Sequence, residues 1–184
     1  MPADSVSFCS RCGRAVDWQI PDGDTLPRHV CAGCGTVHYQ NPKIVVGCVP
    51  EQDGRILLCK RAIPPRAGYW TLPAGFLENG ESLEAGAIRE TLEEAMARVE
   101  ILRMLAVVDV IDSHQVHVTY AAKLLGSYGA GHETLDARLF EAADVPWADI
   151  AFRSVEFALR RYLDDRASGV DRLHTTAIRG LPPP

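Results

Sequence analysis

The segment from residue 75 to residue 96 contains the side chains best suited to chemistry, and most of them are carboxylates. Glu90, Glu93 and Glu94 are spaced so that a helix would place all three within an arc of roughly 100°. They repel one another at a cost of about a few tenths of a kcal/mol per pair, and only Arg89 lies beside them. Mg²⁺ or Mn²⁺ would relieve the repulsion, because hard divalent ions prefer oxygen ligands. A merely solvated acidic face is the alternative.

A helix from about Ser82 to Ala95 is expected to present these carboxylates. Ser82 is suited to the N-cap, and Glu84 in the first turn complements the helix dipole. Helical spacing collects small and apolar residues on the opposite face, which we expect to pack against the protein: Ala85, Ile88, Leu92 and Ala95.

Four cysteines form a second group with a ligand-like spacing. Cys9 and Cys12, like Cys31 and Cys34, form a Cys-x-x-Cys pair followed directly by a glycine. Tetrahedral zinc takes four such thiolates, and a complete shell leaves no position for water. The pattern therefore predicts a structural zinc ribbon over residues 1–40. Two redox pairs are the alternative, but such pairs are not usually duplicated.

The remaining cysteines and the nearby histidines receive simpler interpretations. Cys48 and Cys59 lie in apolar runs, and free cysteine packs as a small hydrophobe, so both are expected in the core. His29 and His38 are expected to be surface or packing residues because four thiolates already complete the zinc shell.

The chain after the cysteine pairs predicts a mixed α/β domain over residues 41–166 and a C-terminal tail over 167–184, with loosely held prolines at its end. A loop or an interrupted strand is expected from Ile63 to Gly80, and Asp53-Gly54 predicts a hairpin turn. The expected strands are Lys43–Val49, Arg55–Cys59, Arg103–Ile111, Gln115–Leu124 and Arg138–Phe140, and the second helix is Ser154–Arg166.

Composition excludes several classes of function. The chain has 184 residues, is 47% hydrophobic and has a formal net charge of −5, which argues against non-specific nucleic-acid binding. Residues 1–40 hold three arginines and four aspartates, so the ribbon has no basic stripe. We find no secretory signal and no apolar run long enough for a bilayer. A cytoplasmic protein without a membrane or nucleic-acid partner is expected.

The carboxylate segment resembles the Nudix box, whose pattern is Gly-x5-Glu-x7-Arg-Glu-x-x-Glu-Glu-x-Gly. Six of its seven fixed positions agree: Gly75, Glu81, Arg89, Glu90, Glu93 and Glu94. Met96 stands where the family has glycine, which ends the helix in a left-handed conformation. Methionine would adopt that conformation at a cost of about 1 kcal/mol, or the helix would end differently.

The resemblance implies an α/β/α sandwich around a mixed sheet. It also implies that Glu90, Glu93, Glu94 and the Gly75 carbonyl hold Mg²⁺ or Mn²⁺. Arg89 and Glu81 would then brace the ligands. Glu133 is similar to the loop acid that serves as general base in ADP-ribose pyrophosphatases, and Asp136 is its neighbour. An ordinary solvated carboxylate is the alternative for Glu133.

Further segments resemble the zinc-ribbon branch of the Nudix hydrolases: residues 39–43, 57–61, 68–76 and 138–140. That branch acts on FAD, ADP-ribose and NADH, which implies a pyrophosphohydrolase with a dinucleotide-like substrate, and a homodimer. Tyr69 and Trp70 could stack on a base or flavin, and Arg61 could meet a phosphate, although packing is the alternative for the aromatic pair.

Two rival functions stay open at the level of sequence. One is an NADH pyrophosphatase. The other is a nucleotide-sensing regulatory domain without turnover, and the intact glutamates weigh against it because a sensor has no need of them. The loops that choose the substrate vary freely within a fold, so the sequence does not select one nucleotide.

Overall fold

The computed structural model describes residues 6–179 and divides the chain into two compact units, residues 1–41 and residues 42–184. The predicted loosely held prolines, Leu181 to Pro184, lie outside the described residues. Among the residues described, no helix is both long and apolar enough to span a membrane.

The first unit is a small antiparallel sheet of β1 (Val16–Gln19), β2 (Arg28–Cys31) and β3 (Val37–His38). Gly13 and Gly35 follow the second cysteine of each pair, with φ of 73° and 71°. Glycine adopts this left-handed backbone without steric cost, so each turn can bend its two cysteines toward one point.

The second unit contains, within residues 42–179, an eight-stranded sheet whose main order is β10-β5-β4-β9-β8-β11. The pairings β4–β9 and β8–β11 are parallel and the others are antiparallel, so the sheet is mixed. The strands are β4 (Lys43–Gln52), β5 (Arg55–Arg61), β6 (Trp70–Thr71), β7 (Ala74–Phe76), β8 (Arg98–Val110), β9 (Gln115–Leu125), β10 (Thr134–Phe140) and β11 (His174–Ile178).

The predicted hairpin is confirmed, since Glu51 pairs with Ile56 across the turn at Asp53 and Gly54. Both turn residues have positive φ, of 52° and 82°, as a two-residue hairpin turn of the primed type requires. Residues 63–80, expected to be a loop or an interrupted strand, contain the two short strands β6 and β7, and the strand expected from Arg103 begins five residues earlier, at Arg98.

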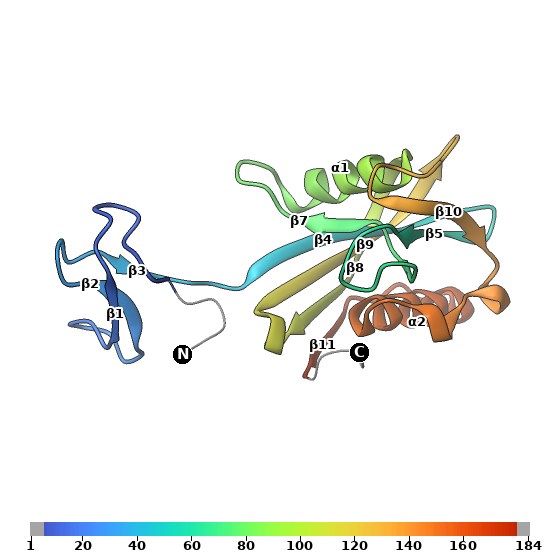
Figure 1. The fold of residues 1–184 in the computed structure, drawn as a ribbon. Helices are drawn as coiled ribbons and strands as arrows, with labels where there is room; N and C mark the ends of the chain where they lie inside the picture. Colours follow the sequence, from blue (N-terminus) through green and yellow to red (C-terminus); the bar gives the residue numbers. More distant parts are fainter. Residues whose placement is uncertain (1–5, 180–184) are drawn as a thin grey trace. The chain divides into compact units, whose positions relative to one another are not determined.

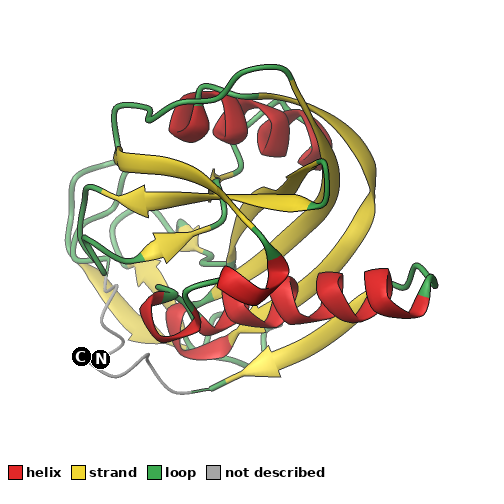
Figure 2. Ribbon diagram, turned by 90° about the vertical axis from the view of Figure 1, so that its right-hand side faces the viewer, coloured by secondary structure: helices red, strands yellow, loops and turns green. Residues whose placement is uncertain are grey.

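Two helices cover opposite faces of the sheet, which confirms the predicted sandwich (Figures 1 and 2). Helix α1 (Leu83–Ala95) packs over a core that includes Val46, Cys48 and Cys59, and both of these cysteines are buried as expected. Helix α2 (Arg153–Ser168) packs over the other face, where the core residues include Val49, Leu105 and Leu159.

The predicted buried face of α1 is wrong in part. Ala95 is buried, but Ala85, Ile88 and Leu92 are exposed, and the helix instead buries Gly86, Ala87 and Thr91. A Cβ on Gly86 would meet Val46, Leu77 and Glu81, so the backbone of α1 lies very close to the sheet. This close approach rotates the helix so that small residues face the core, and large side chains remain outside.

The predicted tail from residue 167 also differs from the structure. Helix α2 continues to Ser168, and residues 174–178 form β11, a parallel partner of β8. Its short pattern, His-Thr-Thr-Ala-Ile, buries only Ile178, so its hydrophobic signal is weak. Polar contacts secure the strand instead, because His174 bonds to the buried carboxylate of Asp165.

Candidate active site

A cavity of about 1030 Å³ opens beside the C-terminal half of α1. Its lining comes from β7, α1 and the loop at Glu133 on one side, and from β9, β11 and the start of α2 on the other. A cavity of this size can hold a dinucleotide-sized ligand. The predicted residues Gly75, Arg89, Glu90, Glu93, Glu94, Glu133 and Arg61 all line it.

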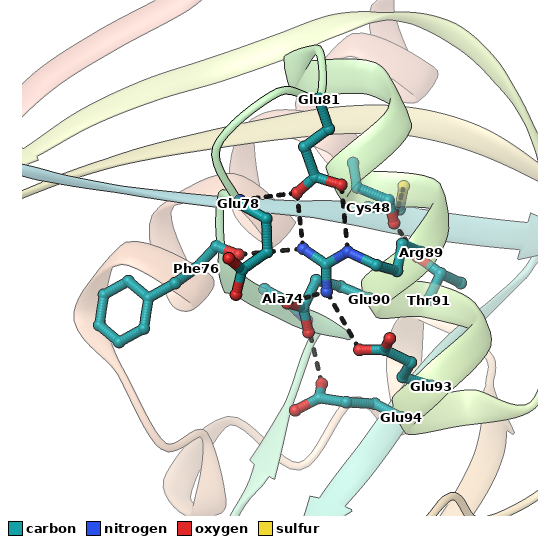
Figure 3. A network of polar contacts seen from close by, with 11 residues as sticks. Cys48, Ala74, Phe76, Glu78, Glu81, Arg89, Glu90, Thr91, Glu93 and Glu94 are labelled. Carbon is teal, nitrogen blue, oxygen red and sulfur yellow. Dashed lines mark hydrogen bonds and ion pairs between the residues drawn. The ribbon is translucent and has the colours of Figure 1, made fainter.

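Arg89 organises the acidic side chains of the site (Figure 3). Its guanidinium binds Glu81 through two nitrogens, at 2.7 and 3.1 Å. One further nitrogen donates to Glu90 at 2.7 Å and to Glu93 at 3.1 Å, and the side chain also reaches the Phe76 carbonyl at 3.0 Å. The pairing with Arg89 holds the pKa of Glu81 below its usual range and raises that of Arg89. Arg89 thus joins Glu81 to Glu90 and Glu93, which is the arrangement that the resemblance to the Nudix box implies.

Glu90 and Glu94 face the short strand β7. A Cβ on Gly75 would collide with the Glu90 carboxylate, so only glycine lets that side chain lie against the strand. Glu94 accepts a hydrogen bond from the Ala74 amide at 3.0 Å. Burial raises the pKa of Glu90, and burial with the nearby charges of Glu90 and Glu133 raises the pKa of Glu94 to about 7.

The end of α1 is fixed by the loop that carries Glu133. The amides of Gly129 and Gly131 bond to the carbonyls of Ala95 and Glu94, at 2.8 and 2.9 Å. A Cβ on Gly131 would collide with the helix backbone, so this loop packs directly on α1. Met96 ends the helix in the left-handed conformation, with φ 47° and ψ 30°. Methionine thus takes the conformation that the usual glycine would take.

The donor set of the cavity fits a hard cation. Glu90, Glu93 and Glu94 supply only oxygen ligands, which hard cations prefer. Arg89 contributes one positive charge, which cannot neutralise these three carboxylates and that of Glu81. The carboxylates of these glutamates lie farther apart than the four thiols of the ribbon. Within residues 6–179, those thiols are the one group of three or more possible metal ligands whose atoms all lie within 4.8 Å of one another.

That thiol group is formed by the four predicted cysteines, Cys9, Cys12, Cys31 and Cys34. The sulfur atoms of Cys9 and Cys34 lie 3.7 Å apart, and those of Cys12 and Cys31 lie 3.5 Å apart. Four sulfurs at such separations fit a tetrahedral zinc ion. His29 is buried and packs on Trp18, with ring centroids 4.6 Å apart, as a packing residue would.

The aromatic pair at residues 69 and 70 does not line the cavity, so the structure favours packing, the alternative to the expected stacking on a base or flavin. Trp70 is 8% exposed and packs edge-on against Phe140 in the core under α2. The Tyr69 ring lies under the guanidinium of Arg66, at 4.9 Å. Strand β6 explains why Trp70 does not reach the cavity, because the pairing of β6 with β5 turns this side chain inward.

Asp136, the neighbour of Glu133, forms an ion pair with Arg138 at 2.7 Å.

The sequence reasoning missed the far wall of the cavity. There, Gln115 and His117 of β9 bond to each other at 2.8 Å, and burial lowers the pKa of His117 to about 4, so its imidazole is neutral near pH 7. Arg153 and Ser154 open α2, and Ile178 ends β11. Of these residues, only the polar pair at the start of α2 could have been identified from the sequence, because the N-terminus of a helix can bind an anion.

Fold and site together define a mixed α/β protein in which a loop and helix present carboxylates to a large cavity, preceded by a four-cysteine ribbon. Comparison with known proteins supplies the family. The chain belongs to the Nudix hydrolase family: residues 41–160 match the family described as NUDIX domain, and residues 7–40 match the zinc ribbon described as Nudix N-terminal.

Individual relatives agree with this assignment. A solved NUDIX hydrolase from Nitrosomonas europaea is 50% identical, with a TM-score of 0.89 over 94% of this chain and 100% of that one. An ADP-ribose pyrophosphatase of Methanocaldococcus jannaschii is 30% identical over 59% of this chain and 67% of its own length. An NAD-capped RNA hydrolase of Photorhabdus laumondii is 33% identical over 55% of this chain, which spans only 38% of that relative.

Proposed function

We propose that this chain is a metal-dependent pyrophosphohydrolase that cleaves the diphosphate bond of a dinucleotide-like substrate such as ADP-ribose or FAD. The observation that carries the proposal is the placement of Glu90 and Glu94 against β7 at the edge of a large cavity. A purely structural acidic face would not need glycine at residue 75.

Glu90, Glu93, Glu94 and the Gly75 carbonyl would hold Mg²⁺ or Mn²⁺. A bound ion of this kind neutralises developing charge on phosphate oxygens and lowers the pKa of a bound water. Arg89 keeps Glu90 and Glu93 in place through its shared nitrogen, and Glu81 fixes Arg89 in turn. The four thiols of the ribbon would hold a structural zinc ion.

Glu133 is the proposed general base. Its side chain is exposed and lines the same cavity as Glu94, and its charge contributes to the raised pKa of Glu94, which supports this role for it. Its backbone carbonyl accepts from the Ala62 amide at 2.9 Å, which anchors the loop to the end of β5.

A hydrolysis screen tests the proposal directly. ADP-ribose, FAD, NADH, NAD-capped RNA and nucleoside triphosphates are each supplied with Mg²⁺ or Mn²⁺, and the products are separated by chromatography. We expect ADP-ribose or FAD to be cleaved, and Glu94→Gln or Glu133→Gln to lower the rate by about 10²–10⁴-fold. Glu100→Gln on β8 is the matched control, because that residue is exposed and lies outside the cavity lining.

NADH pyrophosphatase activity is the second candidate, since several relatives are named NAD-capped RNA hydrolases. Preferential cleavage of NADH in the same screen would select it. Nucleotide binding without turnover, unchanged by Glu93→Gln, would instead support a sensor and contradict both enzymatic proposals. A homodimer and a cytoplasmic location remain predictions.

A further inference from the structure

Helix α2 begins inside the wall of the cavity, opposite the glutamates. The helix is 16 residues long, and its N-cap residue, Phe152, provides no side-chain cap. Glu156 is the first residue of α2 whose backbone amide donates a helical hydrogen bond, to the Phe152 carbonyl at 3.0 Å. Within residues 6–179 the amides of residues 153–155 have no acceptor, so the positive end of the helix dipole faces the cavity, and Glu156 is the one acidic residue in the first turn.

The Ser154 side chain is an independent sign of a ligand at this place. Ser154 is 6% exposed and lines the cavity, yet its hydroxyl makes no hydrogen bond to any residue that the structure describes. The Ser154 oxygen is not among the fully enclosed unpaired side-chain atoms of residues 6–179, so it is open to the cavity that the residue lines. A ligand oxygen in the cavity would supply the missing partner.

Two arginines make this end of the cavity cationic. Arg153 lines it and donates one hydrogen bond, at 2.8 Å, to the Arg179 carbonyl. Arg61 lies with its guanidinium 5.1 Å from the Phe152 ring. Arg61 lines the same cavity as Glu94, and its charge counters the rise that burial causes in the pKa of Glu94.

We propose that the N-terminus of α2, with the Ser154 hydroxyl and the guanidinium groups of Arg153 and Arg61, binds a phosphate group of the substrate. The inference rests on the proposed function for its substrate class. Helix N-termini bind phosphate through free amides and the helix dipole, and arginine matches phosphate geometry. The phosphate is either the second phosphate of the cleaved diphosphate or a further phosphate elsewhere on the nucleotide.

Titration with inorganic phosphate tests the site without catalysis. Amide NMR shifts of the full chain are followed at residues 153–155 in metal-free buffer. We expect saturable shifts there, about tenfold weaker binding in Ser154→Ala, as loss of one charge-assisted hydrogen bond predicts, and no binding in Ser154→Asp. Ser168→Ala, at the other end of α2, should bind like the parent. Shifts that are absent at 153–155, or unaltered by Ser154→Asp, would overturn the proposal.

Steady-state kinetics distinguish the two sources of phosphate. ADP-ribose and its 2′-phosphorylated derivative are compared in the parent chain, in Arg153→Gln and in the control Arg160→Gln, whose residue pairs with Glu156 on the exposed side of α2. A KM raised equally for both substrates in Arg153→Gln identifies the diphosphate. A KM raised only for the phosphorylated substrate identifies the further phosphate. A KM unchanged for both contradicts the site, and if neither substrate is cleaved the NMR titration still decides.

Discussion

Asp165 of α2 is expected to be the most costly charged residue to replace outside the cavity. Its side chain is 1% exposed, and its carboxylate accepts from Arg103 at 2.6 Å, from His174 at 3.0 Å and from the Arg172 amide at 3.2 Å. These three partners lie on β8, on β11 and in the segment before β11. One buried carboxylate thus ties the helix to two neighbouring strands.

Asp165→Asn should lower the free energy of unfolding by about 3–5 kcal/mol near pH 7, because it removes the buried partner of Arg103 and leaves that side chain only the exposed carboxylate of Asp171. For a chain of this length the melting temperature should fall by roughly 6–20 °C, at about 2–4 °C per kcal/mol. The neighbouring Asp164→Asn is the control. Its carboxylate is 59% exposed in a pair with Arg161, and such exposed pairs contribute about 0–1 kcal/mol.

Acidic pH should reduce the difference in the free energy of unfolding between the parent and Asp165→Asn. Burial alone would raise the pKa of Asp165, but the bonds from Arg172, His174 and Arg103 outweigh it and hold the pKa below its ordinary value. The carboxylate therefore stabilises the fold above the pKa of the unfolded chain, about 3.9, and this stabilisation is lost as pH falls through the lower folded value. Urea unfolding of both variants at pH 7 and at a series of lower pH values measures this loss of stabilisation. A loss as small as that of Asp164→Asn, or one that does not shrink in acid, would refute the reasoning.

Three further predictions concern the site and the ribbon. Gly75→Ala should lower kcat/KM for the cleaved nucleotide about 100-fold, because its methyl group displaces the Glu90 carboxylate, and a rate near that of the parent would contradict the geometry. Met96→Gly should raise the urea midpoint by the equivalent of about 1 kcal/mol, since glycine adopts the left-handed conformation freely and Met96 is 60% exposed; an unchanged midpoint would show that methionine bears no strain. Cys31→Ser should reduce bound zinc, measured by atomic absorption, from about one ion per chain to well below that, and retention of the ion would mean a different ligand set.

The sequence predicted those parts of the site that lie close together in the chain. Ser82, the α1 boundaries and the four-thiol cluster follow from fixed spacings over a few turns or two short knuckles, whereas the bracing by Arg89 was implied by the resemblance to the Nudix box. Local geometry determines such groups, so periodicity and capping rules apply to them directly.

The buried face of α1 and the environment of Trp70 could not be predicted in this way. Ile88 and Leu92 are apolar and correctly spaced, yet Gly86 and Ala87 are buried in their place because close backbone packing against β4 decides the rotation of the helix. Trp70 turns inward through the pairing of β6 with β5, which no pattern within residues 63–80 contains. Tertiary packing overrides the local signal in both cases.

Strand β4 pairs with strands that line both walls of the cavity. At Val45, β4 pairs with Phe76 of β7 on one edge and, in parallel, with His117 of β9 on the other. Glu90 and Glu94 of α1 lie against β7, whereas His117 belongs to the far wall, so the proposed metal ligands and the far wall are positioned from opposite edges of β4. Because the parallel partner lies more than 70 residues away in the chain, its register is invisible to local patterns. Substitutions at Gln115 or His117, which line the cavity from β9, are therefore expected to change which substrate is held, whereas Val118 and Tyr120 of the same strand pack in the core with Ala87 of α1.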